Sequence, residues 1–214
     1  MKLGPYNKKR NFKKTPEPKG KVSHKNKNIY VIQKHAASHL HYDLRLELNG
    51  VLLSWAVPKG PCLDPSVKRL AMHVEDHPVE YGHFEGIIPK GEYGGGTVML
   101  WDEGRWESSD EDANAAYKKG HLKFILKGKK LKGEWNLFRF KKDDPKSWFL
   151  VKAKDKYAQS LSEYDVTLKK PNSVLTNADL DEITAHHTKM WTHDEGLVKS
   201  KNSKKPKQKK KSKN

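Results

Sequence analysis

Residues 40–57 read LHYDLRLELNGVLLSWAV, and their pattern decides the fold. Polar and apolar side chains alternate along residues 40–48, and an alternation with a period of two is typical of a β-strand that buries one face. The next two residues, Asn49-Gly50, form the dipeptide that two-residue hairpin turns prefer. The stretch therefore predicts an antiparallel hairpin whose second strand covers residues 51–57.

Other short segments rich in β-branched and aromatic residues surround this hairpin. They predict strands over residues 30–32, 70–74, 81–88, 97–101, 122–126, 133–140 and 148–153. Turn-forming residues stand at 102–104, 127–128 and 143–145, and helical signals cover residues 109–119 and 177–187. Many short strands at near-regular spacing indicate a mainly β fold, an antiparallel barrel or sandwich with one or two short helices.

The net charge of +17 is confined to the two ends of the chain. Residues 1–29 carry ten Lys or Arg and one acidic residue, so their charge is +9. Residues 199–214 carry nine Lys and no acidic residue, and their charge is also +9. The body between them holds 24 basic and 25 acidic residues. We therefore expect disordered basic tails that bind nucleic acid backbones, around a neutral folded body.

This composition divides the chain into four parts. They are a basic N-terminal arm (1–28), a β-barrel or sandwich domain (29–160), a C-terminal extension with a short helix (161–198) and a Lys-rich tail (199–214). No run approaches the ~20 apolar residues of a membrane span, and no apolar segment typical of a secretory signal follows the N-terminus. A single cysteine supports neither an internal disulfide nor a multi-cysteine zinc site. We expect a cytoplasmic, nucleoid-associated monomer.

One face of the first predicted hairpin strand carries side chains suited to metal and phosphate. Alternation places His41, Asp43 and Arg45 on this face. The opposite face, expected to meet the core, carries Tyr42, Leu44, Leu46 and Leu48. Imidazole nitrogen and carboxylate oxygen can hold a divalent metal, and His35, just before the strand, can supply a third ligand. Arg45 beside such a metal suits a phosphate, which a guanidinium binds bidentately.

A second polar cluster follows in the strand predicted over residues 70–74. Arg69, His73 and Glu75 are expected to share one face of it. His77 stands just before a proline, at the expected end of the strand, where a side chain can reach a cleft. The spacing alone is not diagnostic of a function.

Two other features carry weaker signals. The glycines at residues 94–96 lack the Gly-Lys-Ser/Thr ending of a phosphate-binding loop, so they predict a turn that leads into a strand. Trp55 and Trp101 are expected mostly to fill the core, although either would be able to stack on a nucleobase if it were exposed.

Three functions remain open on these residues. The first is a metal-dependent phosphoesterase. The second is a non-haem iron oxygenase, because His41-x-Asp43 with a distal histidine is similar to a facial triad. The third is a non-catalytic binder of nucleic acid that relies on its basic tails. Arg45 favours phosphate over a small organic co-substrate, and the binder leaves the His, Asp and Arg row unexplained.

Several separated motifs, taken in order, resemble one known family. They are HAASHLHYDLRLELNGVLLSWAVPKGP, RLAMHVEDHPVEYGHFEGIIPKGEYGGGTVMLWDEGRW, GHLKFILKGKKLKGEW and SWFLVKAKD. Over roughly residues 6–160 they resemble the 3′-phosphoesterase domain of bacterial DNA ligase D. The resemblance implies a compact β-barrel with a metal site in a groove. It also implies removal of 3′-terminal ribonucleosides and of 3′-phosphates during DNA repair, with Mn²⁺ or another divalent metal as the cofactor.

The resemblance further implies roles for individual residues. The metal ligands would be His35, His41 and Asp43. Arg45 would bind the scissile phosphate, and His77 would contact it and stabilise the transition state. Other residues near the phosphate would be Tyr81, Lys59, Arg69 and Glu75, and the N-terminal arm would add Glu17 and Arg10.

The chain departs from the family pattern at Asn11, where an acidic residue usually follows the arm's arginine. If that acid assists removal of a ribonucleoside, we expect the diesterase activity to be weaker here than the monoesterase activity. The resemblance covers no ligase or polymerase segment. We therefore expect DNA or a primer-template as the substrate, and a separate ligase or polymerase as a partner.

Overall fold

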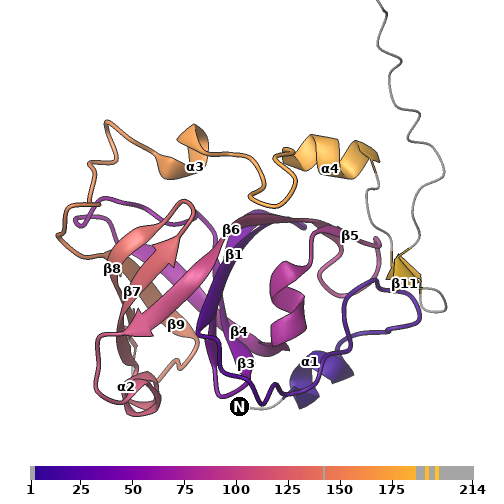
Figure 1. Ribbon diagram of the computed structural model, residues 1–214, viewed down its shortest axis with the longest axis horizontal. Coiled ribbons are helices and arrows are strands. Elements are labelled where there is room, and N and C mark those ends of the chain that lie inside the picture. The colour runs from indigo at the N-terminus through magenta and orange to yellow at the C-terminus, as the bar shows by residue number, and fades with distance from the viewer. Residues whose placement is uncertain (1–2, 142, 187–190, 193–195, 198–214) are drawn as a thin grey trace, which may run out of the picture.

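The computed structural model describes residues 3–141, 143–186, 191–192 and 196–197, and its centre is a closed antiparallel β-barrel (Figure 1). A nine-stranded sheet has the order β1-β2-β3-β4-β9-β8-β7-β6-β5, and an additional pairing of β1 with β6 closes it. The strands are β1 (Ile29–Ala36), β2 (Leu40–Leu48), β3 (Val51–Val57), β4 (Arg69–Pro78), β5 (Gly86–Ile88), β6 (Gly96–Ser108), β7 (His121–Gly128), β8 (Lys132–Arg139) and β9 (Ser147–Lys152). The expected mainly β barrel is confirmed.

Short helices and one small hairpin complete the described chain. The helices are α1 (Gly4–Lys8), the 3₁₀ helix η1 (Val79–His83), α2 (Ala113–Lys119), α3 (Val166–Lys169) and α4 (Leu180–His186). The strands β10 (Trp191–Thr192) and β11 (Gly196–Leu197) pair with each other. Among the described residues, no helix is long and apolar enough to cross a membrane.

The hairpin predicted from residues 40–57 forms as β2 and β3. Both turn residues have the positive φ that the favoured hairpin turn requires, 52° at Asn49 and 76° at Gly50. The apolar face of β2 lies in the main core, where the largest fully buried side chains include Trp55, Trp101 and Trp135. Both exposed-tryptophan alternatives are thereby wrong, because Trp55 and Trp101 are wholly buried.

The turn predicted at residues 102–104 is wrong, because β6 runs through it. The carboxylate of Asp102 is buried and accepts hydrogen bonds from the Tyr30 hydroxyl and from the backbone N–H groups of Lys130 and Leu131. A polar residue that would suit an exposed turn therefore anchors the β7–β8 loop inside the barrel. Sequence composition does not distinguish these two uses of an aspartate.

Two other elements have bounds that differ from those expected. Most of residues 81–88 are not a strand, since η1 precedes the three residues of β5. Helix α2 begins only after Asp112, whose side chain accepts hydrogen bonds from two backbone N–H groups of the first turn, and it stops at Gly120 with φ 83°. Helix α4 covers the middle of the second predicted helix, and residue 187 lies outside the described residues.

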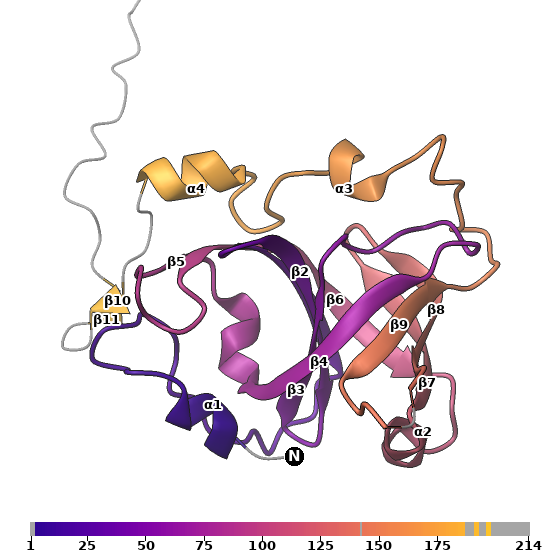
Figure 2. The ribbon, with the colours of Figure 1, turned by 180° about the vertical axis from the view of Figure 1, so that it is seen from behind.

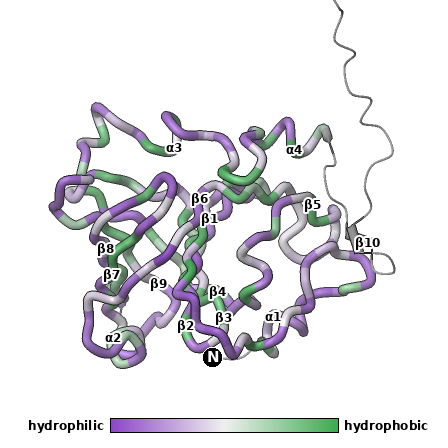
Figure 3. Tube along the Cα trace, viewed as in Figure 1, coloured by the Kyte–Doolittle hydropathy of each residue, from purple (hydrophilic) through white to green (hydrophobic). Residues whose placement is uncertain are grey.

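The N-terminal arm is folded against the barrel where the structure describes it, from residue 3 to residue 28. Helix α1 lies next to η1 in both ribbon views (Figures 1 and 2). The wholly buried ring of Tyr6 packs with Tyr81, Phe84 and neighbouring apolar side chains in a second core cluster. In Figure 3 the arm is largely hydrophilic with isolated hydrophobic residues. The expectation of disorder for this arm is therefore wrong, because a few aromatic anchors fix a mostly basic segment. The tail at 199–214 lies outside the described residues.

The C-terminal extension crosses one side of the barrel through α3 and α4 (Figure 1). Glu85 fixes it close to the start of β5. Its buried carboxylate accepts hydrogen bonds from the hydroxyls of Ser173 and Thr176, each at 2.6 Å, and from the backbone N–H of Leu100 at 2.8 Å. The extension is therefore tied to the same segment that leads from η1 into β6.

Candidate active site

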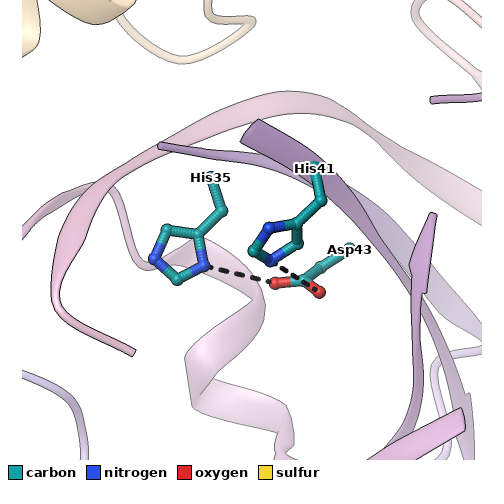
Figure 4. A group of neighbouring side chains, drawn as sticks. All are labelled: His35, His41 and Asp43. Carbon is teal, nitrogen blue, oxygen red and sulfur yellow. Dashed lines mark ion pairs between the residues drawn. The ribbon is translucent and has the colours of Figure 1, made fainter. Parts of the chain in front are cut away.

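The first two strands bring the predicted metal ligands together. In the antiparallel register of β1 and β2, His35 is the direct partner of His41, and Gln33 is the direct partner of Asp43. Directly paired residues point to the same face of a sheet. The ends of two consecutive strands thus place His35, His41 and Asp43 on one side, and Figure 4 shows the three side chains converging.

The three side chains have the geometry of a metal-binding set. One ligand atom from each lies within 4.8 Å of the others. The carboxylate of Asp43 lies 3.8 Å from Nδ1 of His35 and 3.7 Å from Nε2 of His41. Two nitrogens and one oxygen suit divalent Mn, Fe or Zn, and they leave positions for a substrate or water. The residues present therefore fit a divalent metal ion.

Backbone carbonyls orient both imidazole rings. Nε2 of His35 lies 2.8 Å from the carbonyl oxygen of Gly94, and Nδ1 of His41 lies 2.9 Å from that of His39. A carbonyl oxygen can only accept, so these nitrogens carry the ring protons. The unprotonated nitrogens then face Asp43, which is the arrangement that metal ligation needs. Neither carbonyl was foreseen from the sequence, because loop geometry determines its position.

Asp43 is held as a carboxylate. Burial would raise its pKa, but interactions with its neighbours, of which the charge of Arg45 is the largest, outweigh burial and lower the pKa to about 2. The ligand is therefore ionised at neutral pH even before a metal binds.

Arg45 is the buried cation beside these ligands, with 2% of its surface exposed. Its Nη2 donates to the carboxylate of Asp43 at 3.0 Å, and its Nη1 donates to the hydroxyl of Ser54 at 2.8 Å. Its Nε donates to the side-chain oxygen of Gln33 at 2.7 Å. The guanidinium therefore has a single orientation, and its positive charge is directed at the three expected metal ligands.

Gln33 is a site residue that the sequence analysis missed. Its amide nitrogen donates to the carbonyl oxygens of Tyr81 at 3.1 Å and Phe84 at 2.8 Å, while its oxygen receives Arg45. It therefore joins η1 to the guanidinium. Its phase with His35 in β1 was the available signal, since residues two apart in a strand share a face.

His77 lies between two arginines. Its Nδ1 is 2.9 Å from Nη1 of Arg45 and 2.8 Å from the carbonyl oxygen of Glu75, and its Nε2 is 3.1 Å from Nη2 of Arg10. Donation from Nδ1 to Glu75 and acceptance at Nε2 from Arg10 satisfy both ring nitrogens. Burial, followed by the charges of Arg45 and Arg10, lowers the pKa of His77 well below its usual value. The ring is therefore neutral at neutral pH.

The N-terminal arm supplies the second arginine. Arg10 forms an ion pair with Glu17 at 2.7 Å and another with Glu75 at 3.1 Å, and its guanidinium lies 3.8 Å from the ring centroid of Tyr6. The structure thus brings Arg10, Glu17 and Glu75 together, although Arg10 and Glu75 are far apart in sequence. All three had been expected near the site from the resemblance.

A β-bulge determines which residues of β4 reach the site. The pairing of β4 with β3 shifts between Val74 and His77, so a simple alternation does not continue. Val74 and Glu75, although consecutive, both line the same cavity, which has a volume of about 170 Å³. His73 instead packs on Trp55 in the core. The prediction that His73 and Glu75 share one face is therefore wrong, because the bulge changes the phase of the strand.

Most residues expected at the site line this cavity, and a few lie elsewhere. Its lining includes Arg10, His35, His41, Asp43, Arg45, Glu75, His77, Tyr81 and Tyr93. Glu17, Lys59 and Arg69 are not among its lining residues, although Glu17 pairs with Arg10. Asn11 is exposed, and its side-chain oxygen accepts a hydrogen bond from the backbone of Lys13. The structure shows where the expected residues lie, and the role expected for each of them stays a prediction.

Comparison with known proteins decides the family. Residues 33–139 match the DNA ligase D 3′-phosphoesterase domain family. This chain belongs to that family. The match covers His35, His41 and Asp43, the bulge of β4 and the loop that leads into β6.

Three curated relatives extend the similarity beyond these residues. The chain is 54% identical over 182 residues to the "Multifunctional non-homologous end joining protein LigD" of Pseudomonas aeruginosa. The aligned region makes up 83% of this chain and 22% of the relative. It is 44% identical to the protein of the same name from Mycolicibacterium smegmatis, over 72% of this chain and 21% of the relative. It is 41% identical to the "Multifunctional non-homologous end joining DNA repair protein LigD" of Mycobacterium tuberculosis, over 75% of this chain and 21% of the relative. The chain thus spans about a fifth of the length of these relatives.

The metal cluster generates a first prediction. Asp43→Asn keeps the size of the side chain but removes the charge and one strong ligand, so Mn²⁺ affinity is expected to fall about 100-fold or more. Isothermal titration calorimetry with Mn²⁺ measures the change. Asp64→Asn is the matched control, because this carboxylate lies outside the cavity and accepts a hydrogen bond from Ser66. Equal affinities for the Asp43 variant and the control would contradict the assignment.

The position of His77 generates a second prediction. The pKa of His77 in the folded protein lies below the unfolded value of about 6.5. At pH values between the two, the unfolded chain therefore binds more protons than the folded chain. Stability from this group is complete above pH 6.5 and declines as the pH falls below it. NMR of ¹⁵N-labelled imidazoles is expected to show a neutral His77 at pH 6. Arg10→Met, but not Arg10→Lys, should raise its pKa, and a protonated ring at pH 6 in the unmodified protein would exclude this account.

Proposed function

We propose that the chain is a metal-dependent phosphoesterase that processes 3′ ends of nucleic acid. It would remove 3′-terminal ribonucleosides as a phosphodiesterase and 3′-phosphates as a phosphomonoesterase, leaving 3′-hydroxyl ends for DNA repair. The observation that carries the proposal is the convergence of His35, His41 and Asp43 beside the buried guanidinium of Arg45 in one cavity. Membership of the 3′-phosphoesterase family supports the same chemistry.

The ligand set would hold Mn²⁺ or another divalent ion. When bound, such an ion polarises a phosphate oxygen and balances the charge that develops on the phosphate. Arg45 would bind the phosphate beside it, because its guanidinium already faces Asp43 and needs no reorientation. The bonds from Arg45 to Gln33 and Ser54 would hold the cation in place as the phosphate changes geometry.

His77 would donate a hydrogen bond from its Nε2 atom to the phosphate. In the absence of substrate, Nδ1 donates to the carbonyl of Glu75. When a phosphate oxygen stands at Nε2 in place of the Arg10 guanidinium, the other tautomer has support as well, because Arg45 can donate to Nδ1 at 2.9 Å. The ring could then donate from Nε2 to the phosphate without rotating. Tyr81 would keep it in place, since the two ring centroids lie 4.8 Å apart.

DNA or a primer-template is the proposed substrate, and a separate ligase or polymerase is the proposed partner. The names of the relatives, which refer to non-homologous end joining, support this assignment. The basic segments would add affinity for any phosphate backbone. We propose that the chain acts as a monomer in the cytoplasm, at the nucleoid. The two arginines in the cavity make an iron oxygenase the weaker alternative. A simple binding protein is weaker too, because it leaves the convergence of His35, His41 and Asp43 unexplained.

The main test uses a primer-template that ends in one ribonucleotide or in a 3′-phosphate. With Mn²⁺ both ends are expected to become 3′-hydroxyl ends, and EDTA should stop both reactions. His41→Ala should lower both rates about 100-fold or more, because it removes a metal ligand. DNA binding, measured by fluorescence anisotropy, should change little and should weaken steeply with salt.

His83→Ala is the control for this test, since that histidine is exposed and lies outside the cavity. Consumption of oxygen without release of phosphate would support the oxygenase instead. Unchanged behaviour of the His41 variant in every assay would leave only the binding protein.

Asn11 generates a separate prediction about the balance of the two activities. An acid at this position is proposed to assist only the ribonucleoside step, so Asn11→Asp should raise the diesterase rate relative to the monoesterase rate. The substitution is expected to preserve the fold, because a carboxylate can accept the same hydrogen bond from the backbone of Lys13. Rates on the two substrates, measured with one enzyme preparation, give the ratio. An unchanged ratio would remove the idea.

A further inference from the structure

Tyr93 is the exposed aromatic side chain at the edge of the metal-site cavity. It lines the same cavity as His35, His41 and Asp43, yet 47% of its surface is accessible. The other tyrosine in the lining, Tyr81, is buried. An accessible ring beside a phosphate site has a use in nucleic acid recognition, because every base offers a π-face on which to stack.

The loop between β5 and β6 holds Tyr93 in a fixed place. Backbone hydrogen bonds join Glu92 to Pro89 at 3.1 Å and Gly95 to Glu92 at 3.0 Å. Gly94, the residue after Tyr93, has φ 77° and places its carbonyl oxygen 2.8 Å from Nε2 of His35. Tyr93 is therefore one residue from the group that orients a metal ligand. A base resting on its ring would lie next to a phosphate at the metal cluster.

Cations of the N-terminal arm lie over the ring of Tyr93, so a base would stack on the part of the ring that remains exposed. The ammonium of Lys9 lies 4.7 Å from the ring centroid, and the guanidinium carbon of Arg10 lies 5.4 Å from it. The Lys9 ammonium also donates to the hydroxyl of Tyr93 at 3.1 Å and to Glu75 at 3.0 Å. These contacts fix the ring, and they place positive charge where the phosphates of a nucleic acid end would lie.

We propose that Tyr93 is the stacking platform for the nucleobase of the 3′-terminal nucleoside. The inference rests on the proposed phosphodiesterase, for which that nucleoside is the leaving group. With the scissile phosphate at Arg45 and the metal cluster, the terminal base rests on Tyr93. Recognition by stacking tolerates any of the four bases. The platform matters less for a 3′-phosphate end, because no nucleoside follows that phosphate.

A purely structural role for Tyr93 gives a different pattern of effects. If the residue only clasps the arm, its hydroxyl matters, since that group receives the hydrogen bond from Lys9. If it stacks on a base, the ring matters and the hydroxyl does not. Tyr93→Phe separates the two roles, and Lys9→Met removes the clasp from the other side.

The experiment uses a primer-template with 2-aminopurine riboside as the 3′-terminal nucleoside and the full chain in EDTA, so that binding is measured without turnover. Stacking on the ring should quench the fluorescence of 2-aminopurine. Tyr93→Ala should remove the quenching and weaken binding about 5- to 100-fold, while Tyr93→Phe should keep the quenching. Tyr157→Ala is the control, because that exposed tyrosine lies outside the cavity.

Turnover with Mn²⁺ gives a second readout. Tyr93→Ala should raise KM for the ribonucleoside end far more than for an end that carries an abasic ribose. Equal losses on the two ends would overturn the proposal, as would equal losses in Tyr93→Phe, Lys9→Met and Tyr93→Ala. Failure of the proposed function looks different, because the unmodified protein would then quench 2-aminopurine in EDTA but release no product with Mn²⁺.

Discussion

The buried charge of Arg45 is the constraint on which the site depends. Burial of an unpaired guanidinium is expensive, so its surroundings must supply anions and hydrogen-bond acceptors. Three residues meet this requirement. Asp43 lies on the same strand as Arg45, and Gln33 and Ser54 lie on the neighbouring strands β1 and β3. Each of these partners then has a fixed position of its own. Through these bonds the guanidinium fixes Asp43, which is an expected metal ligand, and Gln33, which anchors η1. It also determines the surroundings of His77.

The same constraint explains why both faces of β2 are buried. A strand with one solvated face would leave Arg45 and Asp43 hydrated, and water would weaken the interactions between them. The N-terminal arm and η1 cover that face, and Tyr6 and Tyr81 pack together above it. Residues 3–28, whose net charge is +8, thus become part of the folded structure through a few aromatic contacts. The aromatic contacts hold this segment in place, while its charge would add affinity for a phosphate backbone.

The sequence was informative wherever period-two alternation holds. It predicted the hairpin, the apolar face of β2 and the grouping of His41, Asp43 and Arg45, all of which the structure confirms. It failed at the bulge of β4, where an extra residue changes the phase, and at Asp102, where a turn-forming residue anchors a loop from inside the barrel. The carbonyls of His39 and Gly94 were beyond it, because every residue type carries a carbonyl and only the fold decides where one points.

The balance of charge in the cavity favours a site that is organised before substrate arrives. Arg45 is already paired with Asp43, and Arg10 with Glu17 and Glu75. In the proposed monoesterase reaction, a divalent ion and the dianion of a 3′-phosphate would enter as a nearly neutral pair, so neither arginine would have to lose its carboxylate partner. The positive groups would then face the phosphate with little rearrangement, and electrostatic stabilisation is most effective under this condition. The carboxylates of the arm and of β4 therefore contribute by holding the cations still, even where they touch no substrate.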